Sequence, residues 1–291
     1  MRQETGLLAL RPPSRAAGAQ LFFQSWHPDR PKAAILLAHG YAEHAGRYQG
    51  FARQAVEAGY AVYALDHWGH GRSDGTRGFV PHFSVFLDGM AALLTHVQTT
   101  VPALPRIVLG HSMGGLIAAT HLLTHQADYV AAVLSGPAVK PGTPPSALTR
   151  LIGQLLARLA PKAGLIQLEA EAVSRDPDVV ARYKADPLVY TGKMSARLAA
   201  EMLGAMDRLQ GQAAAIRLPL LVAFGGEDRL AAPEGGAELV ARIASSDKEF
   251  RLLPGLYHEI FNEPEHVAVI NDVLGWIDAR LAPASNTQAT L

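Results

Sequence analysis

RIVLGHSMGGLIAATHLL, residues 106–123, is the segment of the chain that is most informative about its fold. It joins a short apolar run at 107–109 to a helical pattern of apolar residues, and Gly110 and Gly114 flank Ser112 in the turn between them. Glycines leave room for a sharp strand-to-helix turn, which projects one side chain beside the free N–H groups at the start of the helix. The stretch therefore predicts a strand–turn–helix unit that presents Ser112 as a nucleophile.

Other apolar runs along the chain also end abruptly in Gly, His, Asp or Pro. They are AAILLAHG (33–40), YAVYALDHWGHG (60–71), VAAVLSGP (130–137) and LPLLVAFGGED (218–228). Nearly continuous apolar strands that alternate with helical patterns are typical of an α/β protein whose mostly parallel sheet carries helices on both faces. In such sheets the reactive groups lie just beyond the carboxyl ends of the strands.

The alternation of strands and helices stops between Pro137 and Arg217. Residues 147–160 of this segment, ALTRLIGQLLARLA, place leucines at helical spacing. We expect a helical cap over 137–217, and its leucine stripe is expected either to pack as ordinary core or to line an acyl-chain tunnel. The core of the protein is then formed by two parts of the chain, 1–136 and 218–281, and a flexible tail follows at 282–291.

Composition excludes several classes of protein. Of 291 residues, 49% are hydrophobic, and 26 Lys and Arg balance 26 Asp and Glu, which argues against disorder and against nucleic-acid binding. The absence of cysteine excludes disulfides, thiolate metal sites and a cysteine nucleophile. No secretory signal and no run long enough to span a membrane is visible, so we expect a soluble cytoplasmic protein.

A serine hydroxyl needs a base to take its proton and a carboxylate to hold that base. In this type of sheet the three groups follow the chain order Ser, Asp or Glu, His. Asp228 and His258 both follow strand-like runs after Ser112, and we assign Ser112 as nucleophile, His258 as general base and acid, and Asp228 as the group that orients the imidazole. Glu227 is an alternative carboxylate, whereas His266 lies in an expected helix.

The charge that develops on an attacked carbonyl oxygen needs hydrogen-bond donors. One is the backbone N–H of Met113, directly after the nucleophile, and the second comes from the loop after an early strand. His39 and Gly40 turn the chain there, which makes the N–H of Tyr41 the candidate.

Other patterns in the chain indicate structure more than chemistry. Asp66 ends a strand but precedes the serine, and the run GHGRSDG (69–75) fails the dinucleotide pattern at its third position. Histidines suggest a metal site, but the chain has no helix-borne ligand pair, so structural hydrogen bonding is the favoured interpretation and no metal is expected. These histidines are His39, His44, His67 and His70.

Six motifs are spread along the chain: HGYAEHAGRY (39–48), DHWGHGRSDG (66–75), GHSMGG (110–115), DPLVYTGKM (186–194), GGEDRLAAP (225–233) and YHEIFNEP (257–264). Together they resemble the monoacylglycerol lipase and lysophospholipase branch of the α/β-hydrolase superfamily. The resemblance extends over nearly the whole chain.

The resemblance implies an α/β-hydrolase fold, the same three catalytic residues, the same oxyanion donors and a lid over about 137–217. In that branch the loop that bears Glu43, His44 and Arg47 lies near the alcohol end of the pocket. The resemblance therefore implies that Glu43 and Arg47 either help to form a glycerol site or simply pair with each other.

The function expected from these features is a serine ester hydrolase that uses no metal and no cofactor and acts on a small amphiphilic ester. The resemblance implies monoacylglycerols as the first choice of substrate, with lysophospholipids or short and medium-chain esters as alternatives. An amidase or peptidase, an acyltransferase and a non-catalytic binding protein are more distant alternatives. The cap is a candidate for peripheral contact with a membrane or micelle, and the oligomeric state is left open.

Overall fold

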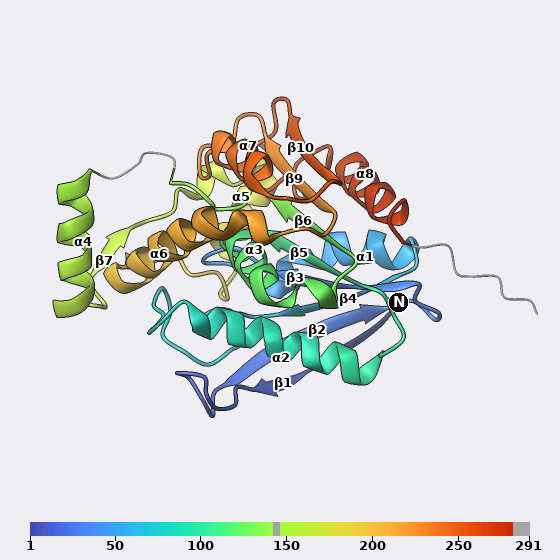
Figure 1. Cartoon of the computed structure of the whole chain (residues 1–291), viewed down its shortest axis with the longest axis horizontal. Helices are drawn as coiled ribbons and strands as arrows, with labels where there is room; N and C mark the ends of the chain where they lie inside the picture. The colour runs from blue at the N-terminus through green and yellow to red at the C-terminus, as the bar shows by residue number, and fades with distance from the viewer. Residues whose placement is uncertain (142–145, 282–291) are drawn as a thin grey trace, which may run out of the picture.

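An eight-stranded sheet lies at the centre of the molecule, in the order β1-β2-β4-β3-β5-β6-β9-β10 (Figure 1). The computed structural model describes residues 1–141 and 146–281, so the tail expected at 282–291 lies outside the described residues. The first two pairs in this order, β1/β2 and β2/β4, are antiparallel, and the other neighbours are parallel. The strands are β1 (Arg2–Ala9), β2 (Gln20–His27), β3 (Ala33–Ala38), β4 (Tyr60–Leu65), β5 (Arg106–His111), β6 (Ala131–Ser135), β9 (Leu220–Gly225) and β10 (Lys248–Leu253).

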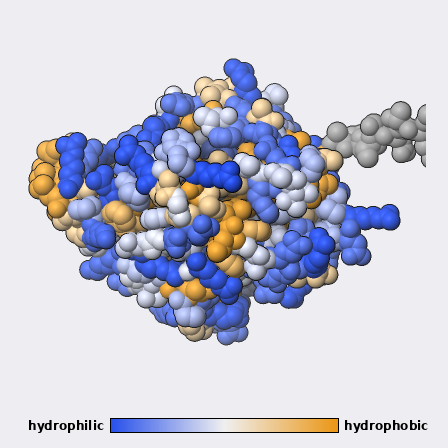
Figure 2. Space-filling model, turned by 90° about the horizontal axis from the view of Figure 1, so that it is seen from below, coloured by the Kyte–Doolittle hydropathy of each residue, from blue (hydrophilic) through white to orange (hydrophobic). Residues whose placement is uncertain are grey.

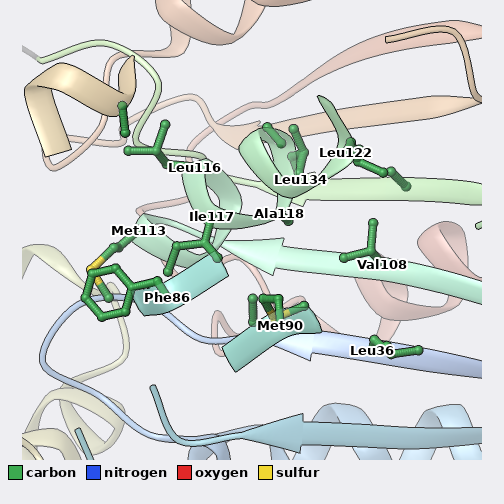
Figure 3. Close-up of a cluster of buried hydrophobic side chains, with 14 of the residues drawn as sticks. Leu36, Phe86, Met90, Val108, Met113, Leu116, Ile117, Ala118, Leu122 and Leu134 are labelled. Atoms are coloured by element: carbon green, nitrogen blue, oxygen red, sulfur yellow. The ribbon is translucent and has the colours of Figure 1, made fainter. Parts of the chain in front are cut away.

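Both faces of the sheet are covered by helices, so the central strands β3, β4, β5, β6 and β9 are buried at nearly every position. Alternate residues of β3 point to opposite faces, so that Leu36 joins the cluster with α2, α3, α7 and the later helix α6 (Ala196–Gln212), and Ile35 joins the cluster with α1 and α8. Figure 3 shows Leu36 and Val108 of the strands facing Met90 of α2 and Ile117 of α3. The helices are α1 (Gln49–Glu57), α2 (Ser84–Thr100), α3 (Met113–His125), α7 (Pro233–Arg242) and α8 (His266–Asp278), with short 3₁₀ turns η1 (Ala45–Tyr48) and η2 (Gln126–Asp128).

The chain leaves the sheet between β6 and β9, which are hydrogen-bonded neighbours. We call residues 137–217 the inserted segment. Its helix α6 packs against α3, and α4 lies against α6 at the edge of the molecule (Figure 1). The elements of this segment are α4 (Ala147–Leu159), β7 (Gly164–Ile166), η3 (Ala170–Ala172), α5 (Pro177–Ala185), β8 (Met194–Ser195), α6 (Ala196–Gln212) and η4 (Ala213–Ala215).

The leucine stripe of α4 forms the expected helix, but most of its apolar side chains face solvent. The exposed fractions run from 49% for Ile152 to 76% for Leu159, and Leu148, Leu151 and Leu155 lie between them. Figure 2 shows apolar side chains gathered at the same edge of the molecule. The interpretation of this stripe as ordinary core is therefore wrong.

The parallel part of the sheet and its helices match the expected α/β class, whereas the first edge strand does not follow from the apolar runs. β1 pairs with β2 over its whole length, although most of its side chains are exposed. None of the described helices combines the length and the apolar composition that crossing a bilayer requires.

Candidate active site

Ser112 lies in the turn between β5 and α3 with φ 53° and ψ −119°. Residues other than glycine rarely adopt a positive φ of this kind. The turn is tight because the start of α3 lies directly against the end of β3. A β-carbon at Gly114 would come within 2.1 Å of the Ala38 carbonyl oxygen, and one at Gly110 within 2.3 Å of the Gly114 carbonyl oxygen. The glycines are therefore required by close backbone contact, and the strained turn holds the Ser112 hydroxyl at the rim of the sheet.

Asp228 and His258 form a hydrogen bond across the loops that follow β9 and β10. His258 Nδ1 lies 2.7 Å from Asp228 Oδ2. The other carboxylate oxygen accepts the backbone N–H groups of Leu230 and Ala231 at 2.8 and 3.0 Å. This fixes the imidazole with Nδ1 as donor and leaves Nε2 free to accept a proton. Glu227, the alternative carboxylate, is exposed.

The Ser112 turn and the His258 loop meet at the same rim. His111 directly precedes Ser112, and its ring centroid lies 4.7 Å from that of His258. A β-carbon at Gly136, which follows β6, would lie 3.1 Å from His258 Nδ1 and 3.3 Å from Asp228 Oδ2. Within the described ranges the Ser112 hydroxyl makes no hydrogen bond to the imidazole, a contact that in hydrolases often tightens only when substrate binds.

The charges around His258 favour its protonated form. Burial alone would lower the pKa of His258, but the Asp228 carboxylate, followed by Glu259 and Glu43, raises it above its usual value. Burial likewise opposes ionisation of Asp228, yet the pKa of Asp228 is lowered by the charge and hydrogen bond of His258. The neighbouring His111 is buried, which lowers its pKa to about 3 and keeps it neutral. The arrangement can hold a proton on His258 next to an ionised Asp228.

The loop after β3 carries the expected oxyanion donor, and His39 fixes its direction. The His67 N–H lies 2.9 Å from His39 Nε2, so His39 Nδ1 carries the proton and donates to the Gly40 carbonyl oxygen at 2.7 Å. The Gly40 carbonyl and the Tyr41 N–H belong to one planar peptide and point in opposite directions. In the described part of the chain, neither the Tyr41 nor the Met113 backbone N–H donates to another protein atom, so both are free to donate a hydrogen bond to a negatively charged oxygen.

The same loop is held by Glu43 from the other side of Gly40. Glu43 Oε1 accepts the Gly40 N–H and the Tyr48 hydroxyl, each at 2.6 Å, and Glu43 Oε2 accepts from Arg47 at 2.8 Å. Of the two interpretations left open by the sequence for Glu43 and Arg47, the structure contains the pairing of the two side chains. Both side chains are buried, at 3% and 9% exposed.

The pair has a third member that the sequence reasoning did not single out. Arg47 donates two parallel hydrogen bonds to Glu259, the residue after His258, at 2.6 and 2.8 Å. Asn262 donates to the same carboxylate at 2.9 Å. Although burial opposes it, the Arg47 guanidinium holds the pKa of Glu259 below its usual value. Glu259 is inside the quoted motif YHEIFNEP, but its partner Arg47 lies 212 positions away, so no local spacing signals the contact.

The remaining histidines of the early loops pack together in the interior. The ring centroids of His39 lie 4.4 Å from His67 and 5.3 Å from His70. Burial lowers the pKa of His67 to about 3 and that of His70 to about 4, so both are neutral. Among the residues that the structure describes, no group of three or more His, Cys, Asp or Glu is arranged to hold a metal ion. Asp66 accepts the backbone N–H groups of Ala45 and Arg72 and so organises these loops.

A cavity of about 520 Å³ lies in the inserted segment, next to the loop that carries Tyr41. Two of its lining residues contact that loop. The Tyr183 ring of α5 lies 4.6 Å from the Arg47 guanidinium, and the Tyr190 ring lies 6.5 Å from that of Tyr41. The Tyr190 N–H also donates to the Ala42 carbonyl oxygen at 2.8 Å. The wall of this cavity and the candidate oxyanion loop are therefore one connected structure.

About nine-tenths of the chain is similar to known hydrolases. The family described as serine aminopeptidase, S33, matches residues 29–265. A monoacylglycerol lipase of Mycolicibacterium smegmatis is 46% identical over 265 residues, which covers 91% of this chain and 95% of the relative. A human monoglyceride lipase is 32% identical over 274 residues, with 92% of this chain and 90% of the relative covered. The crystal structure of a monoacylglycerol lipase from Paleococcus ferrophilus superimposes with a TM-score of 0.81 at 28% identity, covering 89% of this chain and 99% of that one.

Proposed function

This chain belongs to the serine aminopeptidase S33 family, with an α/β-hydrolase fold, and from its similarity to monoacylglycerol lipases we propose that it hydrolyses monoacylglycerols to a fatty acid and glycerol. The chain is a serine hydrolase of the carboxylic ester class. The choice of monoacylglycerol follows the relatives, because a triad alone does not define the leaving group.

The proposed reaction begins when Ser112 Oγ attacks the ester carbonyl and His258 Nε2 takes the hydroxyl proton. The negative charge on the carbonyl oxygen is stabilised by the N–H groups of Tyr41 and Met113. His258 then protonates the departing glycerol oxygen and leaves an acyl ester on Ser112. A water molecule, deprotonated by His258, attacks the acyl ester and releases the fatty acid. Asp228 keeps the imidazole in the tautomer that both steps require.

The observation that carries this proposal is the strained serine turn beside an imidazole that is bonded to a buried carboxylate. A structural serine has no need of a positive φ of 53° at the start of a helix. A loop histidine without a catalytic role has no need of a carboxylate whose own amide contacts hold it in place. These features support a nucleophile, a base and an orienting group in the roles assigned to Ser112, His258 and Asp228.

The experiment that tests the proposed function is a hydrolysis panel with the whole protein. The panel compares monoacylglycerols of several chain lengths with lysophospholipids, triacylglycerols, short aryl esters and aminoacyl amides, and Ser112→Ala serves as the control. We expect the highest kcat/KM on monoacylglycerols and no turnover by the variant. Preferential cleavage of the amides, or equal turnover by Ser112→Ala, contradicts the proposal.

We further propose that α4 contacts the surface of the lipid that holds the substrate. Four leucines and Ile152 of this helix are about half exposed or more, whereas side chains at helical spacing in a globular protein normally bury such a stripe. An apolar stripe of this size on the surface marks an interaction site. A monoacylglycerol is itself an amphiphile in a membrane or micelle, which supports a lipid surface as the occupant.

Binding to phosphatidylcholine vesicles tests this contact. Replacing Leu151 and Leu155 by Gln is expected to weaken vesicle binding by about 10- to 100-fold, since each leucine loses part of its transfer free energy. Leu252→Gln in β10 is a matched control, because that leucine is 50% exposed but lies outside α4. Equal vesicle binding by the double variant and the wild type contradicts a role for α4.

A further inference from the structure

We propose that Glu43, Arg47 and Glu259 form an ionic bridge that positions the oxyanion peptide against the His258 imidazole. They act as positioning residues for the reaction. The inference rests on the proposed function, because it assigns how the two halves of that same site keep their relative position. Nothing in the bridge is assigned to contact substrate.

The bridge joins two loops that are far apart in the sequence. At one end Glu43 accepts the Gly40 N–H at 2.6 Å, one peptide before the Tyr41 amide. In the middle Arg47 Nη1 donates to both carboxylates, at 2.8 Å to Glu43 and 2.6 Å to Glu259. At the other end Glu259 is bonded covalently to His258. Each contact is a charge-assisted hydrogen bond, which is short and directional.

Burial makes the bridge stiff. The three side chains are between 3% and 9% exposed. Arg47 holds Glu259 through its two terminal nitrogens, Nη1 and Nη2, a fork geometry that fixes orientation as well as distance. The Tyr183 ring lies against the guanidinium at 4.6 Å, and the Glu259 N–H donates to the Val173 carbonyl oxygen at 2.8 Å. Tyr183 and Val173, both in the inserted segment, therefore pack against the bridge and restrict its movement.

A purely structural ion pair would not need this placement. The attacked carbonyl must sit within reach of the Ser112 hydroxyl, the oxyanion amides and the imidazole at once, and misplacement by about 1 Å can cost about 100-fold in rate. The Tyr41 amide and the imidazole lie on loops after β3 and β10, which are not neighbours in the sheet. The bridge supplies the connection that the sheet does not.

The bridge also contributes charge to the imidazole. With Arg47 counted as one positive charge and each carboxylate as one negative charge, the group is net negative, which favours the protonated form of His258. Glu259 and Glu43 accordingly raise the pKa of His258, after the larger effects of burial and Asp228. The charged and titratable groups that face the imidazole are Asp228 after β9, His111 of β5, and Glu43, Arg47 and Glu259 of the bridge.

Glu259→Gln tests the bridge, and Glu263→Gln is its matched control. Glu263 lies four positions further on and is also buried, and its carboxylate accepts from the backbone N–H of Arg175 at 2.8 Å and from its side chain at 2.5 Å. The Glu263→Gln substitution therefore removes a comparable buried charge opposite an arginine and leaves the oxyanion loop untouched. Arg47→Lys is a second variant, which retains the charge but not the fork, in case Glu259→Gln fails to fold.

The readouts are kcat, KM and the pH dependence of kcat/KM on a monoacylglycerol, measured on folded protein. We expect Glu259→Gln to lower kcat by about 10- to 100-fold with KM unchanged, because positioning acts on the transition state. In this variant the acid limb of the kcat/KM profile should move to lower pH. Glu259 raises the pKa of His258, and the substitution removes its negative charge. Arg47→Lys should lower kcat in the same way, and Glu263→Gln should keep the wild-type kcat and pH profile.

Equal kcat and an equal acid limb for Glu259→Gln and Glu263→Gln would overturn the bridge, since both variants then report only on loop stability. An unchanged kcat for Arg47→Lys would overturn it as well. Failure of the proposed function is distinguished from failure of the bridge, because in that case the wild-type protein itself does not hydrolyse the monoacylglycerol.

Discussion

Two regions of the molecule invert the usual distribution of side chains, and they do so in opposite senses. Around the candidate active site, charged groups are buried: Asp228 is fully enclosed, and Glu43, Arg47 and Glu259 are almost so. On α4 the reverse holds, and leucines such as Leu159 stand in solvent. The first inversion costs desolvation and the second leaves apolar surface exposed to water.

Both inversions oppose stability, and so they mark places where the fold serves function. Each buried charge of the site has its hydrogen-bond partners, so the site is a closed network in which removal of one member leaves another unpaired. The exposed leucines of α4 belong to no such network. The helix is held against α6, for instance by the hydrogen bond of 2.9 Å from Arg150 Nη1 to Asp207 Oδ2. We therefore expect substitutions in the site to have large effects and substitutions on α4 to have small effects on the folded state.

The largest effect is expected where the site is broken at Asp228. Asp228→Asn should lower kcat by about 10⁴-fold, because the amide favours the wrong imidazole tautomer. In the wild type Asp228 raises the pKa of His258, so kcat/KM should fall with acid around a midpoint above the usual value of 6.5, and the residual activity of the variant should have a lower midpoint. Steady-state kinetics across pH measure both.

Glu227→Gln is the control for that substitution, since Glu227 is the exposed neighbour of Asp228. It should leave both kcat and the pH profile at wild-type values. A loss in Glu227→Gln as large as that in Asp228→Asn would contradict the assignment of the orienting carboxylate.

A smaller effect is expected where the inserted segment packs on the site. Tyr183 of α5 is 4% exposed and its ring lies against Arg47. Tyr183→Ala should lower the free energy of unfolding by about 3 kcal/mol, as for other large-to-small changes at buried aromatic positions. Denaturant unfolding measures it, and a loss below about 0.5 kcal/mol, which is typical of a surface position, would show that α5 is not anchored there.

The smallest effect is expected on α4. Leu151→Gln and Leu155→Gln should each change the free energy of unfolding by less than about 0.5 kcal/mol, because neither side chain is buried. The same denaturant unfolding applies. A loss of more than about 2 kcal/mol would mean that these leucines pack in the folded protein, and the contrast between the two regions would disappear.

The features that could be predicted from the sequence depend on local pattern. The apolar runs at 33–40, 106–112 and 218–228 each become a parallel strand with a reactive or structural group at its end, because full burial on both faces demands continuous apolar sequence. The order of Ser112, Asp228 and His258 can also be recognised along the chain, and in the structure Asp228 and His258 are hydrogen-bonded.

The rest depends on contacts that no local pattern carries. The leucine spacing of α4 is the same for a core helix and for an exposed one, so the sequence predicts the helix but not its surroundings. Glu259 gains its meaning only from Arg47, a partner brought to it by the fold. The tautomer of His39, which directs the Tyr41 amide, is set by the backbone N–H of His67 in the loop after β4. The sequence alone does not reveal this contact.

Every step proposed above requires Ser112 to be a nucleophile activated at the rim of the sheet. Reaction of the folded protein with a fluorophosphonate, followed by peptide mass spectrometry, is a direct test of that role. We expect one phosphonyl adduct, located on Ser112, and no adduct in folded Ser112→Ala. A folded wild-type protein that stays unlabelled, or an adduct that persists in Ser112→Ala, would contradict it.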